Sequence, residues 1–151
     1  MPLPNRLIDW LILRSKRTPY FHLEGYMERY WLLPYARWRP AARIHHILRS
    51  DDDRVFHDHP WAYVTVILRG GYWEITPVFD PSGLYQGEQK KWYGPGSVLF
   101  RKAKSWHRLE LPKGETCWTL FSTGQWVQHW GFLAAPKSKV HWKEYLGEQQ
   151  Q

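Results

Sequence analysis

Apolar runs bounded by turn residues recur along most of the chain and predict β-strands. Residues 62–68 form an almost uninterrupted β-branched and aromatic run, which is typical of a buried strand. Gly70 and Gly71 follow it and predict a tight hairpin with residues 72–75 as the return strand. Because no helical segments alternate with the strands, the pattern predicts an all-β fold. Further strands are expected at 23–33, 43–50, 98–100, 116–121 and 128–133.

The two ends of the chain and one central interval break this strand pattern. Residues 7–14 would place apolar side chains almost all round a helix that Asn5 could cap. We expect this helix to pack on the strands or to seal a dimer, rather than to lie on a membrane surface. The interval 79–91 is rich in polar and turn residues and is expected to be a loop. The predicted organisation is a single domain, 1–151, with a helical extension at 1–20, a core at 43–133 and a tail at 136–151.

A closely spaced pair of histidines is the strongest chemical signal in the sequence. His57 and His59 are two residues apart in a segment expected to be extended, so both side chains project from one face, about 6 to 7 Å apart at the backbone. This is a chelating geometry. Asp58 points to the opposite face and is expected to anchor a loop or to accept a hydrogen bond behind the site. A bulge at Pro60 would instead make Asp58 a further ligand.

These segments resemble the two sequence motifs of the cupin superfamily. The first motif is HxH, then a glutamate and a closing glycine, and the second is a glycine turn, an apolar strand and a histidine. The glutamate is missing here, because Tyr63 and Val64 occupy its two positions. A weaker resemblance, through residues 45–46 and 50–54, is to uncharacterised cupin-like proteins of phages and prophages. The residues that match the cupin motifs are His57, His59, Gly70 or Gly71, Pro95, Gly96, Val98, Leu99, Phe100 and His107.

The cupin resemblance implies a double-stranded β-helix, or jelly-roll barrel, in which His57, His59 and His107 converge. Three neutral imidazoles can hold a divalent transition metal, here iron, zinc, manganese or nickel, and leave coordination positions open. Without the glutamate the metal would keep its full charge and favour anionic co-ligands. Cupins with three histidine ligands include non-heme iron oxygenases. The resemblance therefore implies an oxygenase-like enzyme that acts on a small anionic substrate.

The same resemblance singles out residues around the histidines. Tyr63 takes the vacant glutamate position and Arg101 lies near the second-motif histidine, so both are expected to meet the substrate and to act as catalytic residues. His45 and His46 alternate along the strand 43–50, so one of the two should face inward. Further candidates for the site are His46, Asp58, Glu74 and Trp106.

Two other functions remain open on this sequence. Some cupins that epimerise or isomerise nucleotide-linked sugars need no metal and use a histidine base with a tyrosine acid. His57 or His59 could supply the base, and Tyr63 or Tyr72 the acid. The third function is a non-catalytic barrel that binds a small ligand or a partner, with the histidines as hydrogen-bonded core groups.

Charge and composition limit the binding partners and the cellular location that can be expected for this protein. The net charge of +7 favours anionic partners, but the cations are scattered and form no recognised nucleic-acid-binding module. No segment has the roughly eighteen apolar residues that span a bilayer, and the start does not look like a signal peptide, so a cytoplasmic location is expected. The apolar N-terminal helix and the 17% aromatic content exceed what a monomer covers, which predicts a homodimer. The single Cys117 is expected to be a buried, inert thiol.

Overall fold

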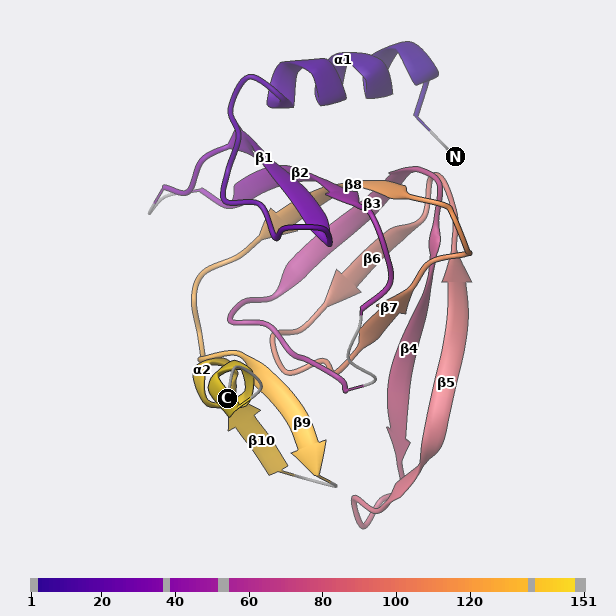
Figure 1. Ribbon diagram of the computed structural model, residues 1–151, viewed down its shortest axis with the longest axis vertical. Helices are drawn as coiled ribbons and strands as arrows, with labels where there is room; N and C mark the ends of the chain where they lie inside the picture. Colours follow the sequence, from indigo (N-terminus) through magenta and orange to yellow (C-terminus); the bar gives the residue numbers. More distant parts are fainter. Residues whose placement is uncertain (1–2, 37–38, 52–54, 136–137, 149–151) are drawn as a thin grey trace.

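The computed structural model describes residues 3–36, 39–51, 55–135 and 138–148, which form β-structure with a helix near each end (Figure 1). No helix in these ranges is long and apolar enough to cross a membrane. The helices are α1 (Asn5–Ser15) and α2 (Trp142–Glu148). The strands are β1 (Met27–Leu33), β2 (Ala41–Ile47), β3 (Tyr63–Arg69), β4 (Tyr72–Phe79), β5 (Tyr85–Tyr93), β6 (Val98–Arg101), β7 (Arg108–Glu110), β8 (Cys117–Thr123), β9 (Gly131–Ala135) and β10 (Ser138–His141).

The strands form two main antiparallel sheets. One has five strands in the order β1-β2-β8-β3-β6, and the other has three in the order β5-β4-β7. The pair of β9 and β10 lies with α2 at one end of the molecule, and α1 lies across the outside of the larger sheet (Figure 1). The prediction of an all-β fold is confirmed. The larger sheet also takes in β1, which precedes the residues 43–133 expected to form the core.

The five-stranded sheet buries apolar residues on both of its faces. Ile8 and Ile12 lie one helical turn apart on α1 and pack against Ile44 and Leu68 on the outer face. Full burial of an aliphatic side chain contributes about 1.5–3 kcal/mol, so these two isoleucines fix α1 on the sheet. The inner cluster consists of Ile47, Ile67, Tyr72, Leu99, Leu109, Leu111 and Cys117.

The turn at Gly70 and Gly71 joins the two sheets. β3 pairs with β6 and β8, whereas β4 pairs with β5 and β7. The return strand after the glycines is confirmed, but the predicted hairpin is wrong, because each strand finds its partners in a different sheet. Gly70 has a φ of 76°, and a Cβ at this position would lie 2.2 Å from the carbonyl oxygen of Thr116. The close approach of the backbone at Thr116 therefore requires glycine here.

Two further predictions about the elements are corrected. Residues 79–91, expected to be a loop, contain most of β5, which pairs with β4 from Tyr85 to Tyr93. Most side chains of β5 are exposed, so no alternation of apolar and polar positions marked this strand. The tail is not only an extension, because it contains β10 and α2. α1 begins at Asn5, which is itself helical, and its start has no side-chain cap.

Candidate metal centre

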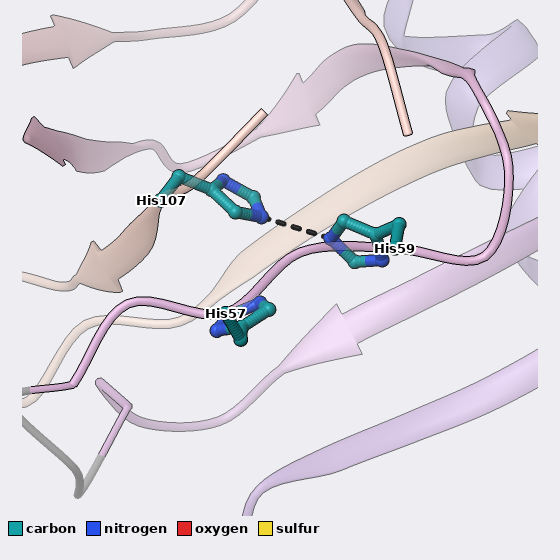
Figure 2. A group of neighbouring side chains, drawn as sticks. All are labelled: His57, His59 and His107. Carbon is teal, nitrogen blue, oxygen red and sulfur yellow. Dashed lines mark hydrogen bonds between the residues drawn. The ribbon is translucent and has the colours of Figure 1, made fainter. Parts of the chain in front are cut away.

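Backbone hydrogen bonds hold two histidine-bearing segments side by side. The amide of His57 donates to the carbonyl oxygen of His107 at 2.9 Å, and the amide of His107 donates back at 3.1 Å. The amide of His59 donates to the carbonyl oxygen of Ala103 at 3.0 Å. The segment before β3 is therefore extended along the segment before β7. Both rings of the HxH pair consequently lie next to the ring of His107 (Figure 2).

The three imidazoles converge within reach of one ion. The Nε2 atoms of His59 and His107 are 2.9 Å apart, and one ring nitrogen from each of His57, His59 and His107 lies within 4.8 Å of the others. Two nitrogens bound at about 2.1 Å to one metal, at a right angle, are about 3.0 Å apart. The donors thus fit a divalent transition metal, for which imidazole is a suitable ligand.

Burial keeps two of these rings neutral. Burial and the neighbouring His107 lower the pKa of His57 to about 4, although the charge of Asp51 acts in the opposite direction. Burial, followed by His107 and His57, lowers the pKa of His59 well below its ordinary 6.5. Both rings are therefore unprotonated at neutral pH and can offer a lone pair to a metal without first releasing a proton.

Glu74 on β4 lies behind His107 and fixes its ring. Its Oε1 accepts a hydrogen bond from Nδ1 of His107 at 3.1 Å, and the carboxylate also pairs with the guanidinium of Arg101. Burial alone would raise the pKa of Glu74, but the hydrogen bonds from His107 and Arg101 lower it to about 2. Because Nδ1 carries the proton, the lone pair of His107 is on Nε2, the nitrogen that faces Nε2 of His59.

Tyr63 on β3 is the residue in the sequence position of the usual cupin glutamate, and its hydroxyl reaches the histidines. The hydroxyl lies 3.1 Å from Nε2 of His107, and the side chain is buried. Burial and the charge of Glu74 raise the pKa of Tyr63, so the hydroxyl stays protonated. It can therefore donate a hydrogen bond but does not supply the negative charge of a carboxylate.

The histidines line a cavity of about 680 Å³ between the two sheets. This volume is large enough for a small-molecule ligand beside a metal. Much of its wall is aromatic, with Tyr26, Trp61, Tyr63, Phe121, Trp130 and Phe132 among the lining residues.

Solved structures with the same architecture include two cupins. No profile of a known protein family matches the chain, and no curated protein matches its sequence. A cupin-2 domain from Rhodospirillum rubrum is 12% identical, with 88% of this chain and 80% of that chain covered and a TM-score of 0.52. A cupin 2 conserved barrel domain protein from Rhodopseudomonas palustris is also 12% identical, with 89% and 83% covered and a TM-score of 0.53. The chain has the cupin fold.

Another structure with this architecture is an enzyme, the hydroxypropylphosphonic acid epoxidase from S. wedmorenis. It is 11% identical, with a TM-score of 0.56, and the similarity covers 73% of this chain and 56% of the epoxidase chain. The chain thus spans little more than half the length of that enzyme. These comparisons confirm the predicted jelly-roll barrel. They give no support to the resemblance to phage and prophage proteins.

Asp58 anchors the loop that carries the two histidines. Its carboxylate is almost fully buried and accepts hydrogen bonds from the amide of Gly131 at 2.8 Å, from Nε2 of Gln128 at 2.9 Å and from Nζ of Lys139 at 2.6 Å. These bonds attach the HxH segment to the start of β9. Because Asp58 points away from the two flanking histidines, its carboxylate is engaged in holding the segment that presents them.

The structure separates three other candidates from the cavity. Arg101 is bound to Glu74 and lines a smaller cavity of about 350 Å³, because the buried carboxylate draws its guanidinium away from the histidines. Trp106 lies beneath the ammonium group of Lys139, 5.9 Å from its ring centre. His46 lies on the outer face of β2, where it stacks on Trp118 and pairs with Glu28.

The sequence pattern predicted no role in the site for two residues that lie near the histidines. His45 is the inward-facing member of its pair and lines the cavity, as alternation along the strand allowed. Asp51 accepts a hydrogen bond from the amide of Leu109, and its carboxylate lies 3.8 Å from Nδ1 of His57. Asp51 directly precedes residues 52–54, which lie outside the described ranges and carry part of the weaker resemblance to phage and prophage proteins.

Proposed function

We propose that this cupin binds a divalent transition metal through His57, His59 and His107 and acts as an oxygenase-like enzyme on a small anionic substrate. The observation that carries the proposal is the convergence of three imidazoles, two of them held neutral by burial, beside a cavity large enough for a ligand. Crystal structures of the similar epoxidase include an Fe(II) form and a Co(II) form with substrate. Iron is accordingly the first metal to test, followed by zinc, manganese and nickel.

The residues of the chain have separate roles in this proposal. A metal held by three histidines supplies open coordination positions and Lewis acidity. Glu74 orients the ring of His107, and Tyr63 offers a hydroxyl proton next to the same ring. Tyr63 is therefore the candidate catalytic residue. Arg101 becomes a positioning residue, because it contacts Glu74 and does not line the larger cavity.

Metal analysis of protein purified without a histidine tag tests the first part of the proposal. We expect about one metal per chain and a large loss of occupancy in His57→Ala, His59→Ala and His107→Ala, because two imidazoles bind more weakly than three. The matched control is His46→Ala, which removes a histidine from the outer face of the larger sheet. Wild-type protein that stays empty after incubation with iron, zinc, manganese and nickel would contradict metal binding.

Oxygen uptake tests the enzymatic part. Protein loaded with Fe(II) should consume O₂ when a suitable small carboxylate or phosphonate is present, and Tyr63→Phe should slow this uptake while keeping the metal. Bound metal without O₂ uptake across such a panel would point to the non-catalytic binding module instead.

A metal-free epimerase or isomerase of nucleotide-linked sugars is the second candidate. The observation in its favour is the hydrogen-bond contact between the Tyr63 hydroxyl and Nε2 of His107, which is an acid and base pair that exists without any ion. Turnover of a nucleotide-linked sugar by chelator-treated protein would support this function. Loss of that turnover on chelation would exclude it.

The homodimer and the cytoplasmic location remain predictions from the sequence. Several large apolar side chains are exposed on α1 and on β6, the last strand of the larger sheet, and a second copy of the chain could cover them. The exposed residues are Leu7, Trp10, Leu13, Val98 and Phe100.

A further inference from the structure

A second group of polar side chains lies on the inner face of β1 and β2, away from the three histidines. Arg29 of β1 is opposite His45 of β2, and Trp31 is opposite Arg43 in the same antiparallel register. Directly opposite residues of adjacent strands project from the same face of a sheet. Arg29, Arg43 and His45 all line the cavity of about 680 Å³ that also contains the metal-binding histidines.

Arg43 is a buried cation without an acidic partner. Only 9% of the residue is exposed, and its guanidinium lies over the rings of Trp31, Tyr20 and Trp61 at 4.6, 5.1 and 5.7 Å. Its Nε is buried and has no hydrogen-bond partner, and no carboxylate of the described residues pairs with it. Burial lowers the pKa of Arg43, and nearby Arg29 lowers it further. A buried charge without a partner destabilises the folded protein unless a group of opposite charge pairs with it.

His45 repeats this pattern one position further along the same face of the strand. It is 6% exposed, and its buried Nε2 also has no hydrogen-bond partner. Its ring stacks on Phe121 with the ring centres 4.7 Å apart. Two polar side chains, each more than nine-tenths buried, thus have unpaired nitrogens at the wall of one cavity.

Phe121 connects this group to the metal-binding histidines. Its ring centre is 4.7 Å from that of His45, 4.9 Å from that of Tyr63 and 6.2 Å from that of His59. Arg43 is directly opposite Phe121 in the pairing of β2 with β8. A ligand lying beside Phe121 can therefore reach Arg43 with one end and His59 with the other.

We infer that Arg43 and His45, assisted by Arg29, bind the oxyanion group of a ligand whose apolar body lies on Phe121 and Trp61. The inference rests on the proposed function for what the other end of the ligand meets. A carboxylate or a phosphonate suits the site, because a guanidinium can donate two parallel hydrogen bonds to two oxygen atoms of either group. The aromatic walls favour an apolar body over a bare inorganic anion.

The test uses three probes that share a benzyl group: phenylacetate, benzylphosphonate and the neutral phenylacetamide. Calorimetric titration is carried out on chelator-treated protein and on Zn(II)-loaded protein. We expect at least one of the two oxyanions to bind the chelator-treated wild type, and phenylacetamide to bind roughly tenfold or more weakly. Comparison of the two oxyanions then identifies the preferred group.

Variants identify the residue responsible. Arg43→Gln should weaken oxyanion binding roughly tenfold or more, and Arg43→Lys, which keeps the charge but loses the planar fork, should give a smaller loss. The control is Arg69→Gln, which removes an exposed arginine paired with Asp9 and should leave binding unchanged. If Arg43→Gln does not fold, the probe comparison on the wild type and the Arg43→Lys variant still decide the question.

The possible results separate this inference from the proposed function. Oxyanion binding to chelator-treated protein that depends on Arg43 supports the inference even if no metal binds. Oxyanion binding that requires Zn(II) and is equally tight in Arg43→Gln overturns it while leaving the metal centre intact. Equal affinity of the wild type for phenylacetate, benzylphosphonate and phenylacetamide also overturns it.

Discussion

Replacing Glu74 with glutamine should weaken both the fold and the metal centre, because one carboxylate holds His107 and Arg101 together. The pKa of Glu74 is about 2, against an ordinary value of 4.5. At about 1.4 kcal/mol per pKa unit, this difference corresponds to about 3 kcal/mol of stability in the metal-free protein. Because the pKa is lowered on folding, the contribution is complete above pH 4.5 and is lost as the pH falls toward 2.

We therefore expect Glu74→Gln to lower the free energy of unfolding at pH 7 by about 3 kcal/mol, measured by urea denaturation followed by circular dichroism. Glutamine cannot provide the charge that pairs with Arg101, and its single oxygen cannot replace both carboxylate oxygens, which accept hydrogen bonds from His107 and Arg101. Metal affinity should fall roughly 10- to 100-fold, because the ring of His107 loses its orienting carboxylate. Titration of Zn(II) against a coloured chelator measures this second effect.

The matched control is Glu110→Gln on neighbouring β7. Glu110 pairs with Lys90, and both side chains are 43% exposed. An exposed ion pair contributes little to stability, so the free energy of unfolding of this variant should stay within about 0.5 kcal/mol of the wild-type value. Its metal affinity should also be unchanged. Wild-type metal affinity in Glu74→Gln would refute the positioning role of Glu74, and wild-type stability at pH 7 would refute the energetic argument.

Three further predictions concern other parts of the molecule. Burial raises the pKa of the Cys117 thiol to about 12. Native protein at pH 8 should therefore react with an aromatic disulfide reagent for thiols only after urea is added, and fast reaction without urea would contradict this. Gly70→Ala should destabilise the protein more than Gly25→Ala in urea denaturation, because both have positive φ but only Gly70 has backbone atoms where the Cβ would be; equal losses would count against the steric argument. Light scattering at micromolar concentration should give a dimer that Trp10→Glu disrupts, and a monomeric wild type would rule the dimer out.

The HxH pair could be predicted because it depends on local geometry. An extended backbone is enough to put His57 and His59 on one face, and alternation along the preceding strand predicts that one of His45 and His46 faces inward. The third ligand, His107, could be placed only through the resemblance to cupins. Its approach depends on backbone hydrogen bonds between segments that are distant in sequence.

The partners of the charged residues could not be predicted in the same way, because they depend on which strand faces meet. Arg101 lies near His107 in sequence and was expected to meet the substrate, but β6 presents it to Glu74 of the other sheet. The strand β5 could not be predicted because most of its side chains are exposed and show no alternation of apolar and polar residues. Only its backbone pairing with β4 defines it as a strand. Arg43 was recognisable as a cation, whereas its lack of an acidic partner is a property of the folded cavity.

The distribution of carboxylates connects the metal centre to the oxyanion site. Glu74 is neutralised by Arg101 and Asp58 by Lys139. Among the described residues no carboxylate belongs to the three-histidine cluster. Asp51 also lines this cavity, but Arg29 and Arg43 together add more positive charge than it offsets. A divalent ion bound there would need an anion to offset its charge. We therefore expect metal and oxyanion to strengthen each other's binding. The factor by which Zn(II) raises phenylacetate or benzylphosphonate affinity must equal the factor by which that oxyanion raises Zn(II) affinity, and calorimetric titration in both orders measures it.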